Sequence, residues 1–176
     1  MDRVTSELEK KILLIAEETL KENIEKFTED IRSDIIAQTR AGKDIPNDRK
    51  QPPLAKSTIE TRSYSEKYTD LHPLYSRRRS NLTMTGQLLE AVKGIVKKIS
   101  GKTGYEITFE VSDTTRKQYK SEKARSKNTQ RLTNKELAGY LKDKGREFLG
   151  VRKLMIDRIR RQISQDLRRN IRKILR

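Results

Sequence analysis

Few residues of this 176-residue chain could do chemistry, and they are scattered. Cysteine is absent, so thiolate catalysis, disulfides and cysteine metal sites are excluded. The only histidine, His72, has no second histidine or cluster of carboxylates beside it, and we interpret it as an ordinary loop imidazole. Gly-x-Ser-x-Gly, His-Glu-x-x-His and glycine-rich phosphate loops do not occur. The sequence therefore predicts a protein that is not an enzyme and has no cofactor or metal.

Carboxylates are concentrated in residues 1–40, which hold 10 Asp/Glu against 7 Lys/Arg. On a predicted helix they recur on the outer face, where they are interpreted as solvating groups. These residues are Glu17, Glu18, Glu22, Glu25, Glu29 and Asp30. A paired-carboxylate nuclease is the alternative, and magnesium-dependent DNA cleavage that one carboxylate change abolishes would support it.

Basic residues dominate the rest of the chain, giving a net charge of +16 and a pI near 10.1. Residues 145–176 hold 11 Lys/Arg against 3 Asp/Glu, and residues 113–135 hold 8 against 2. We expect two basic loops to face DNA or an acidic partner surface. Their residues are Arg77, Arg78, Arg79, Lys117, Lys120, Lys123, Arg125 and Lys127. A solvated loop is an equal alternative for the arginine triplet, and the arginines after residue 152 are interpreted as a solvated face or as ion-pair partners.

The predicted core is thin. Only 32% of residues are hydrophobic, 5% are aromatic and the mean hydropathy is −0.92. Such a composition is typical of chains that complete their burial in an oligomer, or that carry long solvated segments. No window approaches the 18 apolar residues that indicate a membrane span, and the polar, acidic N-terminus does not resemble a signal peptide.

Long amphipathic helices are predicted at both ends of the chain. The first covers residues 4–40 and ends at Gly42, and the last covers residues 152–175. The first predicted buried stripe is Ile12, Ala16, Leu20, Ile24, Phe27, Ile31 and Ile35, and the last is Ile156, Ile159, Ile163, Leu167, Ile171 and Ile174. The first helix, roughly 50 Å long at 1.5 Å per residue, exceeds what a thin core can cover. We therefore expect part of its stripe to meet another subunit.

Between these helices the pattern predicts a hub of one short helix and a β-hairpin. The helix covers residues 86–92, with Thr83 or Thr85 as its cap. Strands at 92–99 and 105–111 flank a glycine turn, and Ile107, Phe109 and Val111 alternate with polar residues. Because an isolated hairpin is marginal in water, helices or neighbouring subunits must complete it.

The remaining segments are predicted to be loops with short helices. Residues 41–81 form an extended loop with one helix near 54–64, and residues 113–133 form a basic polar insertion. Asn134 is expected to cap a helix that ends at Gly145 and buries Leu137, Tyr140 and Leu141. An apolar peg at 146–150 could then add a strand to the hairpin. We predict a single α+β domain over 1–176, divided into 1–40, 41–81, 82–112, 113–133 and 134–176.

Three local patterns, in this order, resemble a known family. Pro53, Leu54 and Thr58 are similar to a proline, a leucine and a Ser-Thr helix start; Leu82, Thr85, Gly86 and Leu88 to a leucine, Thr-Gly, leucine signature; and Arg146, Phe148, Leu149 and Gly150 to a peg before the final helix. With long helices at both ends and a hairpin between, they resemble the tailed-bacteriophage virion morphogenesis proteins of the neck and tail-completion family.

This resemblance implies a structural α+β subunit of the virion that is assembled in the host cytoplasm. Neighbouring subunits complete the small antiparallel sheet in a ring, commonly a hexamer, which ends tail-tube growth or joins the tail to the head connector. The implied partners are copies of the chain, the connector or adaptor and the tail-tube protein, with non-specific contact to DNA in the lumen and none to a membrane. The alternative from the residues is a basic nucleic-acid-binding protein, associated with ribosomes or chromosomes, which would bind tightly as a monomer.

Overall fold

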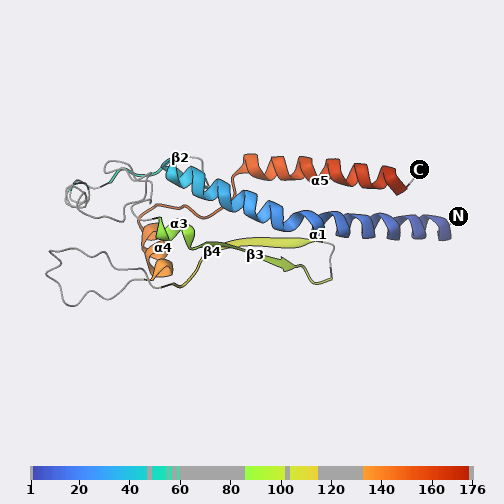
Figure 1. Ribbon diagram of the computed structural model, residues 1–176, viewed down its shortest axis with the longest axis horizontal. Helices are drawn as coiled ribbons and strands as arrows, with labels where there is room; N and C mark the ends of the chain where they lie inside the picture. The colour runs from blue at the N-terminus through green and yellow to red at the C-terminus, as the bar shows by residue number, and fades with distance from the viewer. Residues whose placement is uncertain are drawn as a thin grey trace. The chain divides into compact units, whose positions relative to one another are not determined.

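The computed structural model describes residues 2–46, 49–54, 56, 59, 86–101, 104–114 and 133–174, with side chains from residue 7 to residue 173 of these ranges. The elements in order are α1 (Asp2–Arg40), β1 (Lys43–Asp44), β2 (Arg49–Lys50), α3 (Gln87–Glu90), β3 (Val92–Lys98), β4 (Tyr105–Val111), α4 (Asn134–Asp143) and α5 (Lys153–Ile174). In the described ranges β1 pairs with β2 and β3 pairs with β4, as separate two-stranded sheets. The predicted mixture of long helices and small antiparallel sheets is thus confirmed (Figure 1).

The chain divides into two compact units. The helix unit contains Met1–Arg32, Gly94–Thr108 and Val151–Arg176. The motif unit contains Ser33–Lys93 and Phe109–Gly150. Both α1 and the β3–β4 hairpin contribute residues to each unit.

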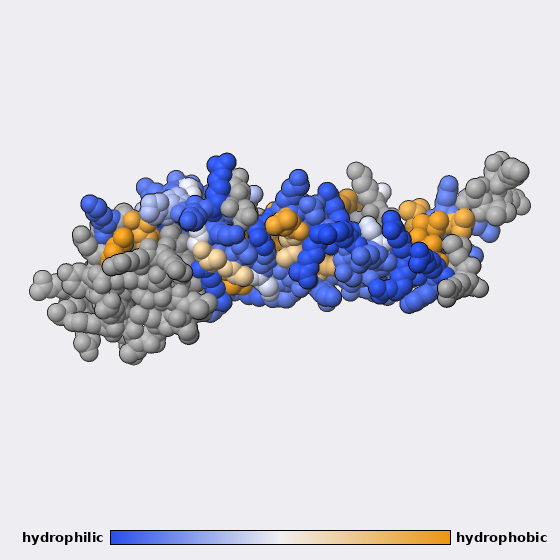
Figure 2. All heavy atoms as spheres, turned by 90° about the horizontal axis from the view of Figure 1, so that it is seen from above, coloured by the Kyte–Doolittle hydropathy of each residue, from blue (hydrophilic) through white to orange (hydrophobic). Residues whose placement is uncertain are grey.

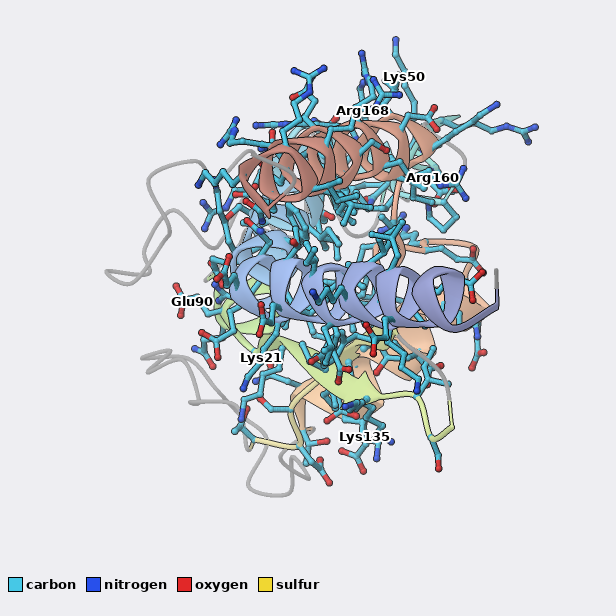
Figure 3. The ribbon with its side chains drawn as sticks, turned by 90° about the vertical axis from the view of Figure 1, so that its right-hand side faces the viewer. Lys21, Lys50, Glu90, Lys135, Arg160 and Arg168 are labelled. Carbon is cyan, nitrogen blue, oxygen red and sulfur yellow. The ribbon has the colours of Figure 1, made fainter. Side chains whose placement is uncertain are left out.

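In the helix unit, α5 lies on one side of α1 and the hairpin on another (Figures 1 and 3). The Asn170 Nδ2 donates a hydrogen bond of 2.9 Å to the Thr19 Oγ1, and Thr19 is only 2% exposed. On the hairpin side, Lys98 forms an ion pair with Glu17. The prediction that Glu17 only solvates the helix was therefore wrong, because a β-strand lysine lies within reach of its carboxylate. These two contacts join α5 and the hairpin to α1.

The buried line of α1 follows one row of residues four apart. Its members are Ile15, Thr19, Asn23, Phe27, Ile31, Ile35 and Thr39, of which Asn23 alone is half-buried. The predicted stripe was correct from Phe27 onward and wrong before it, where Ile12 is exposed and the next three stripe positions are only half-buried. Residues four apart drift by about 40° around a helix of 3.6 residues per turn. The buried line therefore winds around α1, and its polar members hid it from a search for apolar residues.

The predicted core stripe of α5 is only partly covered by its own chain. Met155 is the buried side chain of the described helix, whereas Ile156 is exposed. The other members with described side chains, Ile159, Ile163, Leu167 and Ile171, are half-buried. The prediction that this stripe is simply core was therefore wrong. Within the helix unit, α1 packs against one side of α5 and covers the stripe only in part.

The motif unit includes the last turns of α1, from Ser33 to Arg40, and the segment that follows them. Gly42 has φ 76°, in the left-handed region that favours glycine, and its amide donates to the Thr39 carbonyl. The chain then enters β1, which pairs antiparallel with β2 with Lys43 opposite Lys50. The sequence predicts only loop here, because two-residue strands have no alternating pattern to detect.

The predicted short helix and hairpin are confirmed, with one correction at the cap. Gly86, with φ 77°, is the N-cap of α3 and no side chain caps it, so the expected threonine cap was wrong. The glycine conformation supplies the turn instead. Leu88, Leu89 and Val92 are buried, and β4 alternates between half-buried and exposed residues from Tyr105 to the buried Val111.

Helix α4 begins one residue earlier than the expected cap implied. Thr133 is the N-cap, and its side chain and Glu136 form a reciprocal capping box. Asn134 is instead a buried helix residue whose Nδ2 donates to the Thr114 Oγ1 at 2.8 Å. Tyr140 was predicted to be buried and is 58% exposed, whereas Leu141 is buried and Gly145 ends the helix with φ 69°.

Candidate functional site

Many predicted site residues lie outside the described part of the chain. The basic loop residues predicted to face DNA or a partner all do: Arg77, Arg78, Arg79, Lys117, Lys120, Lys123, Arg125 and Lys127. So do His72, most of the helix predicted at 54–64 and the family-pattern residues Thr58, Leu82 and Thr85. The candidate sites are therefore surfaces formed by described residues of each unit.

The first and third family patterns meet in the motif unit. The Arg146 Nη2 donates a 3.0 Å hydrogen bond to the carbonyl oxygen of Pro53, although the two residues are 93 positions apart. The Ile45 amide donates to the Glu147 carbonyl oxygen at 3.3 Å. The peg 146–150 was predicted to add a strand, and this was wrong: it is a non-strand segment tied to residues 45 and 53.

The family-pattern residues with described side chains are mainly packing residues. Leu54, Leu88 and Phe148 are buried, and Leu149 is half-buried. Gly150 has φ 152°, and a Cβ there would lie 3.2 Å from the Pro46 Cγ. The pattern therefore specifies the packed junction of the motif unit rather than a set of groups aimed at a ligand.

A mainly apolar groove of about 500 Å³ lies beside this junction. Its walls are the end of β4 at 109–111, one side of α4 and the segment 146–149. Lys135, Lys142 and Arg146 bring positive charge to the lining, and Glu110 and Glu147 bring negative charge. Gly139 lies in the α4 wall, and a Cβ built on it would meet nothing within 4 Å. The groove has the character of a packing surface, because its lining is mainly apolar.

A second surface lies at the start of α1 in the helix unit. The turn Ile12–Leu13–Leu14–Ile15 is apolar on every side of the helix, but only Ile15 is buried. Leu13 is 55% exposed and Leu14 60%, and Leu8 one turn earlier is also exposed. Figure 2 shows hydrophobic side chains gathered at this end of the molecule, where the N-terminus lies. A helix turn that is hydrophobic all round normally lies inside a structure, and an exposed patch of this kind marks an interaction site.

One described ionisable group, Lys98, has a pKa that is clearly shifted. The hydrogen bond and the charge of Glu17 raise the pKa of Lys98 above its ordinary value. No group of three or more metal-ligating side chains occurs among the described residues. Within the same ranges, none of the helices combines the length and apolarity required to cross a bilayer.

Comparison with protein-family models, with curated proteins and with solved structures found no match to this chain. The resemblance to the neck and tail-completion family therefore depends on the residue patterns and on the order of the elements.

Two structural features were not predicted although the sequence contains signals for them: the start of α4 and the apolar turn of α1. The Thr133-x-x-Glu136 spacing is a capping box, and it would have placed the start of α4. The adjacent Leu13 and Leu14 lie off the predicted stripe, and an apolar pair there indicates a second covered face. The groove around Gly139 had no signal, because the end of β4 is separated in sequence from α4 and the peg that form its other walls.

Proposed function

We propose that this chain is a structural subunit of a tailed-phage neck or tail top. Copies of it close into a ring that completes the tail and joins it to the head connector around the DNA channel. The role requires an incomplete subunit, built to be finished by identical neighbours, and requires no catalysis. The ring stoichiometry suggested by the family resemblance is six.

The observation that carries this proposal is the exposed apolar turn at the start of α1. Fully burying one leucine contributes about 1.5–3 kcal/mol. In the isolated chain Leu13 and Leu14 lack most of this burial free energy, because each side chain is more than half exposed. The half-buried stripe of α5 and the two separate two-stranded sheets agree with the same idea. A neighbouring copy that covers these surfaces supplies the missing burial.

The test is the mass and shape of the purified full chain. Sedimentation equilibrium and negative-stain electron microscopy should give a closed ring with a central opening. A chain that stays monomeric at every concentration tested, or that forms only a closed dimer, would contradict the proposal. Genes for head, connector and tail-tube proteins beside its own gene would support the assignment to a phage neck.

A basic nucleic-acid-binding protein is the second candidate. It is favoured by α5, where Lys153–Ile174 carries eight Lys/Arg and two Asp. This candidate predicts tight, salt-dependent binding to DNA or RNA by a monomer. Ring formation with weak affinity for nucleic acid favours the neck subunit instead.

A further inference from the structure

The outward side of α5 carries a continuous row of arginines. At 100° per residue, five of them fall within about 100° of the helix circumference. We name them the arginine face: Arg158, Arg161, Arg168, Arg169 and Arg172, with Gln165 among them. All five are exposed. Figure 3 shows Arg168 pointing away from α1, on the side of α5 that no described segment of the helix unit covers.

Acidic residues of the same helix neutralise little of this face. Arg169 pairs with Asp166 at 3.6 Å, and Arg161 donates from its Nε to the Asp157 main-chain oxygen at 3.3 Å. Asp157 and Asp166 are the helix's two acidic residues. The C-terminal part of the face surrounds a shallow hollow of about 470 Å³, lined by Gln165, three of the arginines and Lys173. This hollow is large enough for a phosphate group and is lined by cationic donors.

We propose that the arginine face binds the sugar-phosphate backbone of double-stranded DNA without reading its sequence. Arginine presents a planar fork of donors that matches phosphate oxygens in a bidentate way. From Arg158 to Arg172 the face is about 21 Å long at 1.5 Å per residue. Duplex DNA carries one charge per about 1.7 Å of its axis, so some twelve phosphates fall along that length. Several phosphate contacts can therefore form at once.

Other occupants fit less well. A protein partner would need an apolar anchor near the centre of the contact, and the face has none there, since Leu154 lies at the first turn of α5. A membrane surface would need the apolar side of a basic amphipathic helix, and that side of α5 is turned toward α1. The class of ligand that fits the arginine face is therefore a polyanion. The choice of duplex DNA rests on the proposed function, in which the ring surrounds DNA; the arginine face itself does not.

The test measures binding of labelled duplex DNA of mixed sequence by the full chain, over a series of salt concentrations. The triple variant R161Q/R168Q/R172Q removes three charges from exposed helix positions. The matched control, K21Q/K26Q/K97Q, removes three charges from exposed lysines of the same unit, of which Lys21 lies on the side of α1 away from α5 (Figure 3). Far-UV circular dichroism checks that both variants fold.

We expect the arginine variant to bind DNA at least about tenfold more weakly and to lower the slope of log K against log salt by about 2 to 3, since each phosphate contact contributes about 0.9. The control should change the slope by less than one. The variant R161K/R168K/R172K should keep most of the slope and lose part of the affinity, because lysine cannot form the bidentate contact. Equal losses in the arginine variant and the control, or no loss in either, would overturn the proposal.

Two further measurements separate this inference from the ring. Duplex RNA or polyglutamate that binds the arginine face more tightly than duplex DNA would overturn the choice of DNA. The mass of each variant is measured in parallel. If the chain forms a ring and the arginine changes leave its DNA affinity unaltered, the inference about the arginine face is contradicted and the ring is not. If the chain is a monomer whose DNA affinity falls with these changes, the inference is supported and the proposed ring is contradicted.

Discussion

The two units differ in how fully the chain buries its own apolar residues. In the motif unit Ile45, Leu88, Leu89 and Phe148 are almost wholly inaccessible. In the helix unit Leu13 and Leu14 are more than half exposed, and the stripe of α5 is only half covered. The motif unit therefore buries its main apolar residues within its own chain, whereas the helix unit leaves apolar surface exposed.

The largest effect is expected at the exposed turn of α1. The double change L13Q/L14Q should leave the subunit folded, because Gln is a good helix former and neither leucine is buried. If a neighbour buries both leucines, assembly weakens by about 3–6 kcal/mol, at 1.5–3 kcal/mol each. Sedimentation equilibrium measures the loss. L154Q, a change at another exposed leucine of the helix unit, is the control, and equal assembly by the double variant and the unaltered chain would refute the prediction.

In the motif unit we expect a substitution to lower the stability of the fold itself. Phe148 is 2% exposed at the junction of the peg. F148A should lower the free energy of unfolding by about 3–5 kcal/mol, because it removes a buried aromatic ring and leaves a cavity. Urea unfolding followed by circular dichroism measures this change. A loss below about 1 kcal/mol would mean that the motif unit is not the self-contained core.

Gly150 tests the close approach of the peg to β1 and its following turn. Its φ of 152° and the 3.2 Å between a built Cβ and the Pro46 Cγ both disfavour a side chain. G150A should therefore cost about 1–3 kcal/mol of unfolding free energy. The same urea experiment checks it, and an unchanged midpoint would show that the segment shifts without cost.

Gly139 provides the opposite case within the same unit. It lies inside α4, and a Cβ there would meet nothing within 4 Å. G139A should stabilise the motif unit by about 0.5–1 kcal/mol, because glycine is a poor helix former. Its added methyl also enters the groove beside the junction. Stabilisation together with weaker assembly would show that a neighbour occupies this groove, and destabilisation would contradict the open space described.

The smallest effect concerns the Lys98–Glu17 ion pair. Glu17 raises the pKa of Lys98, so the pair stabilises the fold fully below the ordinary lysine pKa and is lost as the pH rises through the raised value. The variant K98Q should reduce stability slightly at neutral pH, and its difference from the unaltered chain should vanish in strongly alkaline solution. Urea unfolding at both pH values measures this. A difference that grows with pH would have the wrong sign.

Much of the fold could be predicted from the sequence because periodicity extends over long segments. The helix to Arg40, the hairpin and the glycine stops at Gly42 and Gly145 followed from local patterns. What failed depended on tertiary contacts. Thr19 is buried and accepts a hydrogen bond from Asn170, 151 positions away, and no local pattern marks such a pair.

The candidate site was less predictable than the fold. The basic loops chosen for their charge lie outside the described residues, so their role stays a prediction. The arginines of α5 were interpreted as a solvated face or ion-pair partners, because spacing alone does not show which acidic groups lie nearby. Only the arrangement around α5 shows that its two aspartates engage few of these arginines.

Completion of the helix unit by neighbouring copies is tested most directly by the dependence of stability on protein concentration. Urea unfolding of the full chain is measured over a wide concentration range, with the mass determined in parallel. If neighbours complete the helix unit, the unfolding midpoint rises with concentration, because association stabilises the folded state by mass action. A constant midpoint, for a chain that remains monomeric throughout, would show that neighbouring copies do not complete the helix unit.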